Sequence, residues 1–206
     1  MLTRGQRGDT LIEVLFAFSI LSMVIVGAMA IMNQGTIASQ RALETTLVRS
    51  QIDAQATTLR FLHDAYVAKF QPNIAYDAGT PAGQWAAMSE DISATAASSF
   101  ANITSCPAAP SGSFITDASN AKYLSSGNAR FVPAVTSAQV TYDPNTGSLS
   151  QSQGIWVEAI RSVPSTKVNQ QNTGYIDFHI MACWDSPGQG APMTIGTIVR
   201  LYEPRS

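Results

Sequence analysis

One uncharged, apolar stretch near the N-terminus constrains this chain more than any other feature. From Val14 to Met32 there is no charged residue and no proline, and only Ser19 and Ser22 interrupt the apolar character. Both serines can hydrogen-bond back to their own helix. About 19 residues at ~1.5 Å each span ~28 Å, close to the hydrocarbon thickness of a bilayer. The stretch therefore predicts a membrane-spanning helix that carries the rest of the chain.

The residues before this stretch predict its orientation. Residues 1–8 are short and polar and include Arg4 and Arg7. Cationic residues before an apolar segment hold that end in the cytoplasm, so the C-terminal part is expected outside. Residues 28–30 (Ala-Met-Ala) could form a conventional signal cleavage site. Two features argue against this: the apolar run is longer than a usual signal core, and Glu13 lies near its start.

The rest of the chain has the composition of an extracytoplasmic domain. It is rich in small polar residues, and only 13% of the whole chain is charged, with a net charge of −2. This charge gives no nucleic-acid footprint. Cys106 and Cys183 are too far apart for a CxxC motif. In an exported domain we expect them to form one disulfide, worth about 4 kcal/mol for a loop of roughly 80 residues. The alternative is two buried free thiols.

The heptapeptide Gly8-Asp9-Thr10-Leu11-Ile12-Glu13-Val14 resembles the class III signal of type IV prepilins and pseudopilins. A basic leader, a glycine, Thr-Leu-Ile-Glu and an uncharged run follow one another in the family's order. The resemblance implies that a prepilin peptidase cleaves after Gly8 on the cytoplasmic side. Asp9 would become the N-methylated first residue, although Phe or Met is commonest there. The apolar segment would be retained.

Glu13, the fifth residue of the implied mature chain, has two readings. With Thr10 it forms a capping box, in which Thr10 is the helix cap and the carboxylate favours the helix N-terminus. The resemblance implies an assembly role, in which Glu13 pairs with the free amine of Asp9 and sets the register between subunits. A charge near bilayer depth is costly unless paired, which gives this role a physical basis. Both readings can hold in succession.

The pattern changes to a single apolar stripe between about Ala38 and Phe70. Its members recur mostly at spacings of three and four: Leu43, Leu47, Ile52, Leu59, Leu62, Tyr66 and Phe70. Pro72 prevents continuation of the helix. One helix of ~90 Å is therefore predicted from about Thr10 to about Phe70. The stripe needs a partner, which must be the C-terminal part of the chain.

Beyond the helix, residues 71–135 are interrupted repeatedly by proline and glycine and are expected to be irregular, with room for a short helix within Trp85–Phe100. A tight turn is predicted at Asp143–Gly147. Four strands are predicted in an antiparallel meander: Ala138–Tyr142, Gly154–Ser162, Gly174–Trp184 and Thr194–Tyr202.

The predicted fold class is α+β and pilin-like: one long N-terminal helix packed on a C-terminal antiparallel sheet. Residues 1–8 would be the cytoplasmic leader, 9–35 the hydrophobic transmembrane and filament-core helix, and 36–70 the amphipathic half of the helix. Residues 71–206 would form the globular head. Within it we expect the irregular region at 71–135 and the β-meander at 136–206.

No catalytic motif is found, and we predict no enzyme activity, metal site or cofactor. His63 is expected to be an exposed helix residue. His179 shares a strand face with Asp177 but lacks an evident third ligand. The turn at residues 143–147 resembles part of a calcium loop, but Pro144 and the missing distal glutamate favour a plain turn. The three tryptophans could stack on a sugar or base if exposed, but core packing is favoured for at least two of them.

The leading functional hypothesis is a subunit, and more specifically a minor pilin, of a type IV pilus or related filament with a role in adhesion or motility. The implied partners are other pilin subunits, the prepilin peptidase, a membrane platform with its assembly ATPase, and lipid before assembly. One alternative is a pseudopilin of type II secretion or competence. Another is a single-pass anchored binding domain, such as an adhesin, that forms no filament. Whether the head binds DNA or a surface ligand does not follow from the sequence.

Overall fold

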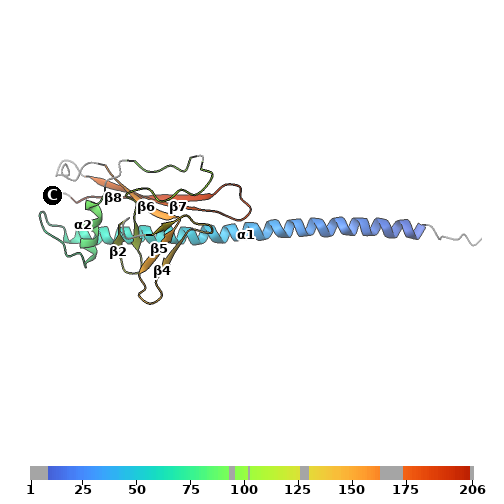
Figure 1. Cartoon of the computed structure of the whole chain (residues 1–206), viewed down its shortest axis with the longest axis horizontal. Helices are drawn as coiled ribbons and strands as arrows, with labels where there is room; N and C mark the ends of the chain where they lie inside the picture. The colour runs from blue at the N-terminus through green and yellow to red at the C-terminus, as the bar shows by residue number, and fades with distance from the viewer. Residues whose placement is uncertain (1–8, 93–95, 102, 126–129, 163–173, 205–206) are drawn as a thin grey trace, which may run out of the picture. The chain divides into compact units, whose positions relative to one another are not determined.

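The computed structural model describes residues 9–92, 96–101, 103–125, 130–162 and 174–204. The chain divides into two compact units, Met1–Leu43 and Glu44–Ser206, which we call the N-terminal unit and the head unit. A single helix, α1 (Asp9–Lys69), contributes to both (Figure 1). The predicted long helix is therefore confirmed, with its described ends within one residue of the predicted ones.

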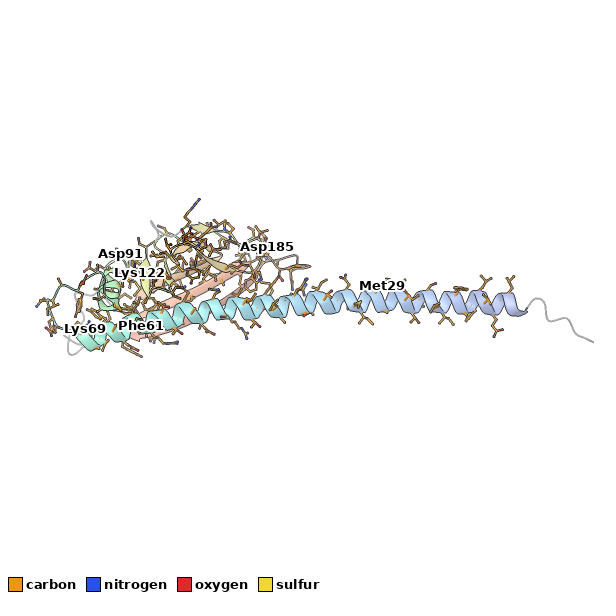
Figure 2. The ribbon with its side chains drawn as sticks, turned by 90° about the horizontal axis from the view of Figure 1, so that it is seen from below. Met29, Phe61, Lys69, Asp91, Lys122 and Asp185 are labelled. Carbon is orange, nitrogen blue, oxygen red and sulfur yellow. A yellow bond between two sulfur atoms is a disulfide. The ribbon has the colours of Figure 1, made fainter. Side chains whose placement is uncertain are left out.

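Within the N-terminal unit, α1 exposes its apolar side chains all round; Met29, labelled in Figure 2, is 66% exposed. Ser19 and Ser22 donate hydrogen bonds to the carbonyl oxygens of Leu15 (2.8 Å) and Phe18 (2.7 Å), as the sequence predicts. These bonds leave no free hydroxyl proton facing an apolar surrounding. By length and composition α1 can cross a membrane.

In the head unit, one side of α1 is buried. Val48, Ile52, Leu59 and Leu62 are at most 3% exposed and recur at helical spacing. The prediction was wrong for Leu47, which is 50% exposed. Leu43, in the N-terminal unit, is 61% exposed and is a second wrong member of the predicted stripe. The buried side of α1 instead contains Val48, Gln55 and Ala56. A search for large apolar residues overlooks the glutamine and the alanine, and therefore misplaces the buried side.

The main sheet of the head consists of β6 (Ile155–Arg161), β7 (Tyr175–Trp184) and β8 (Met193–Tyr202) in that order, all antiparallel (Figure 1). Alternate residues of β7 are fully buried, as expected where one face covers a core: Ile176, Phe178, Ile180, Ala182 and Trp184. These side chains and the buried side of α1 form one hydrophobic core. The α+β arrangement of a long helix packed on an antiparallel sheet is thus confirmed.

A second sheet contains β4 (Gln139–Tyr142) and β5 (Leu149–Gln153), joined by the predicted turn. The predicted meander of four strands was therefore wrong for its first strand, because β4 pairs with β5 and not with the main sheet. The amide of Gly147 donates to the Asp143 carbonyl oxygen at 2.8 Å, and the Asp143 carboxylate accepts from the Asn145 amide at 2.7 Å. A short β3 (Phe131–Val132) pairs with β5 in parallel. The sequence did not predict β5, because its segment Leu-Ser-Gln-Ser-Gln lacks strand-forming residues.

The region expected to be irregular contains α2 (Pro81–Glu90) and a small hairpin of β1 (Ile115–Asp117) and β2 (Lys122–Leu124). Helix α2 begins four residues before the predicted segment. The Thr80 hydroxyl accepts from the Gly83 amide as the N-cap, and Pro81 occupies the first turn, a combination that starts helices.

Cys106 and Cys183 form a disulfide across a sequence separation of 77 residues, as predicted. The bond joins the segment between α2 and β1 to the end of β7. It therefore ties chain with little regular structure to a strand in the middle of the main sheet.

Candidate functional site

The residues predicted to carry processing lie at the start of α1. Gly8 lies outside the described residues, and so does the leader 1–8. Asp9 is the first residue of α1, but the side chains of Asp9 and Thr10 are also outside the described part. Cleavage after Gly8, methylation of Asp9 and capping by Thr10 therefore stay predictions.

Glu13 lies on α1 with its side chain exposed and is flanked by Ile12, Phe16, Ala17 and Ile20. Among the described residues, its carboxylate has no hydrogen bond and no ion pair. An isolated carboxylate on an apolar surface is costly to transfer from water, so a bilayer or a bundle of apolar helices would require a cation beside it. We therefore expect the Glu13 carboxylate to attract one positively charged group.

The head part of α1 also carries exposed apolar side chains. Leu47 and Phe61 are 50% and 52% exposed; Figure 2 shows Phe61 toward the C-terminal end of the helix. Their separation of 14 residues is about four turns, so they lie on nearly the same side of the helix. This side has no partner among the described residues of the head.

The tryptophans are not available for stacking on a ligand. Trp85, Trp156 and Trp184 are at most 2% exposed, so core packing holds for all three and the stacking alternative is wrong. The Trp184 indole N–H donates to the Glu44 carboxylate at 3.1 Å. The Ser186 hydroxyl donates to the same oxygen at 2.7 Å. Glu44 thereby joins α1 to the end of β7.

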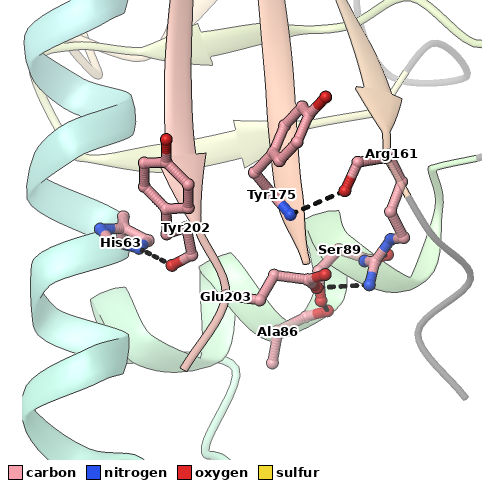
Figure 3. Close-up of polar contacts among 8 residues, drawn as sticks. His63, Ala86, Ser89, Arg161, Tyr175, Tyr202 and Glu203 are labelled. Carbon is pink, nitrogen blue, oxygen red and sulfur yellow. Dashed lines mark hydrogen bonds and ion pairs between the residues drawn. The ribbon is translucent and has the colours of Figure 1, made fainter. Parts of the chain in front are cut away.

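His63 is not the exposed residue that the sequence suggested. Only 13% of its side chain is exposed, because Trp85 of α2 packs against the ring at a centroid distance of 4.9 Å. Its Nε2 lies 2.8 Å from the Tyr202 carbonyl oxygen at the end of β8, and its Nδ1 lies 3.2 Å from an Asp64 carboxylate oxygen. Figure 3 shows the contact between α1 and β8.

A second polar cluster holds the C-terminal segment. The Arg161 guanidinium forms an ion pair with Glu203 and donates a hydrogen bond to the Ser89 carbonyl oxygen at 2.8 Å (Figure 3). Burial raises the pKa of Glu203, and the charge of Arg161 opposes this shift. The cluster joins β6, α2 and the residue after β8, and its contacts give it a structural role.

On the sheet face opposite α1, Arg200 donates two hydrogen bonds to Asp177, at 2.7 and 2.8 Å, and stacks on Tyr175 with its guanidinium carbon 3.9 Å from the ring centroid. The hydrogen bonds from Arg200 hold the pKa of Asp177 below its usual value. The neighbouring His179 has no further ligand, and the described residues contain no group of three metal-binding side chains.

The sequence did not predict the buried hydrogen-bonded pair of Gln55 and Thr116. Gln55 on α1 is 1% exposed, and its amide accepts from the Thr116 backbone N–H at 2.8 Å and hydroxyl at 2.6 Å. The same amide donates to the Thr116 carbonyl oxygen at 2.8 Å. Gln55 therefore pairs with β1 as a neighbouring strand would. The only sign of this pair in the sequence was a glutamine on the apolar side of a helix.

Comparison with known proteins identifies the N-terminal segment. Residues 3–29 match the family model of the prokaryotic N-terminal methylation motif. No curated protein and no solved structure matches the chain. The match covers Gly8 and Asp9, where cleavage is predicted, together with Glu13 and most of the apolar run. It confirms the resemblance: the chain carries the N-terminal segment of a type IV pilin-like or pseudopilin-like prepilin.

Proposed function

We propose that this chain is a non-enzymatic subunit, and specifically a minor pilin, of a type IV pilus or pilus-like filament. The prepilin is held in the membrane by α1 with its N-terminus in the cytoplasm and its head outside. A prepilin peptidase cleaves it after Gly8, and Asp9 is methylated. A membrane platform and its ATPase then move the subunit from lipid into the filament.

The observation that carries the proposal is the unpartnered apolar surface of α1. The apolar run in the N-terminal unit buries none of its membrane-length window within the chain. Leu47 and Phe61 extend apolar exposure to the part of α1 in the head unit. A membrane anchor alone requires only the apolar surface of the N-terminal unit. Helices of neighbouring subunits would cover both, which favours a filament over a single-pass binding domain.

Glu13 supplies the register of assembly in this proposal. Its carboxylate has no partner among the described residues, and cleavage after Gly8 creates an amine four residues earlier. Pairing of this amine with Glu13 of an adjacent subunit removes the cost of an isolated charge in an apolar bundle. The motif match and the exposed position of Glu13 support this role.

The test is the distribution of Glu13→Val between the membrane and sheared extracellular filaments, with Glu13→Asp as the charge-preserving control. We expect Glu13→Val to insert in the membrane at the normal level but to be absent from filaments, and Glu13→Asp to retain measurable incorporation. Normal incorporation of Glu13→Val would refute the assembly role. The same fractionation distinguishes the alternatives. A pseudopilin of secretion or competence is expected in the envelope, whereas a minor pilin is expected in extracellular filaments at low copy number.

A further inference from the structure

Strand β8 forms one edge of the main sheet, and its register tells which backbone groups face outward. The Glu203 amide donates to the Gly174 carbonyl oxygen, so odd-numbered residues of β8 exchange hydrogen bonds with β7. The backbone N–H and C=O groups of even-numbered residues then point away from the sheet. The contact between His63 and the Tyr202 carbonyl oxygen agrees with this assignment.

These outward groups are exposed and unpaired. In the part of the chain that the structure describes, no hydrogen bond is made by the backbone of Thr194, Gly196, Ile198 or Arg200. All four residues are exposed, and because Gly196 has no side chain its exposure is that of the backbone itself. His63 ends this open edge at Tyr202. Residues 194–200 thus present about 20 Å of free strand edge.

This edge lacks the features that usually prevent strand addition. Residues 193–202 contain no proline and no lysine, and the ten-residue register with β7 has no bulge. Arg200 is held by Asp177 and Tyr175 on the sheet face rather than across the edge. By contrast, β6 at the other side of the sheet is bridged by Phe114, which exchanges backbone hydrogen bonds with Val157 at 2.8 and 2.9 Å.

We propose that the β8 edge from Thr194 to Arg200 is a docking site for an extended peptide strand of another protein. Four residues offer up to eight main-chain hydrogen bonds to a strand of about seven residues, and such bonds supply affinity in strand addition. Ile198 is 60% exposed and favours a β-branched or aromatic residue across from it. The ion pair of Arg200 with Asp177 neutralises its charge and favours an uncharged partner strand. The proposal does not depend on filament assembly.

The test uses the full chain in detergent and a fluorescent peptide of alternating threonine and valine with a lysine at each end. The control peptide has the same sequence with every backbone nitrogen methylated, which removes the N–H donors along both of its edges. Binding is measured by fluorescence anisotropy, and hydrogen exchange reports the amides of residues 194, 196, 198 and 200. We expect the unmodified peptide alone to bind and to slow exchange of these amides at least tenfold.

Ile198→Pro removes one outward N–H without removing a β7–β8 hydrogen bond, so the strand is expected to persist. It should weaken peptide binding at least tenfold, whereas Ile198→Thr, which keeps the N–H and strand propensity, should weaken it less than threefold. Equal binding of the methylated peptide, unchanged exchange of the four amides in the wild-type chain, or protection located elsewhere would overturn the proposal. The wild-type exchange measurement decides the matter even if Ile198→Pro fails to fold.

Discussion

Replacement of Gln55 by leucine tests whether the buried amide holds the head against α1. Gln55 and Thr116 are 1% and 0% exposed, and their three hydrogen bonds have lengths of 2.6 to 2.8 Å. Gln55→Leu leaves the Thr116 N–H and C=O buried without partners, at a cost of about 1–3 kcal/mol each. The apolar leucine returns about 1–2 kcal/mol. The expected net loss is about 3 kcal/mol in the free energy of unfolding.

The assay is urea denaturation of the full chain in detergent, followed by the fluorescence of the buried tryptophans. The matched control is Thr57→Leu, because Thr57 is exposed on the same helix, and a surface change of this kind shifts stability by at most about 0.5 kcal/mol. Exchange of the Thr116 amide should accelerate in Gln55→Leu. A loss below about 1 kcal/mol, or one equal to that of the control, would refute the reasoning.

Three further predictions concern the head. Replacing Cys106 and Cys183 together by serine should lower the free energy of unfolding by about 4 kcal/mol, measured by urea denaturation without reductant. Burial raises the pKa of Glu203, so its proton is held more tightly in the folded chain and its stability contribution is lost as the pH rises through the folded pKa; thermal melting against pH should show this fall, and Glu203→Gln should remove it. The pKa of Asp177 is lowered by Arg200, so its contribution is present above the ordinary pKa of 3.8 and lost as the pH falls below it; Asp177→Asn should abolish this acid-side loss.

The long helix was predictable because its signals are local. The run from Val14 to Met32, the stripe that follows it and Pro72 each depend on neighbouring residues, and the described ends of α1 agree with them. The three strands of the main sheet were predictable for the same reason, since β7 alternates half-buried and buried residues from Tyr175 to Ala182.

The errors arose where distant segments decide the environment. Leu47 looks like a core residue by type, but the sheet covers the side of α1 that contains Val48. His63 looks exposed until Trp85, some twenty residues later, packs against its ring. Strand β5 can be polar because backbone pairing with β4 and β3, rather than burial of large side chains, stabilises it.

The polar contacts of the head could not be predicted from the sequence for a further reason. Asp177 meets Arg200 only in one register of β7 and β8, and Gln55 meets Thr116 only after β1 is placed on α1. Sequence spacing does not encode either meeting. In contrast, the N-terminal motif is linear: the order of residues from Gly8 to Glu13 identifies it without any contact between distant segments.

The central claim, that this chain is processed as a prepilin, is tested most directly by the mature N-terminus. Mass spectrometry of the chain purified from membranes of its native cells should give a protein that begins at Asp9 and carries one methyl group on its amine. A chain that keeps Met1, or one that begins after Ala30, would contradict the account.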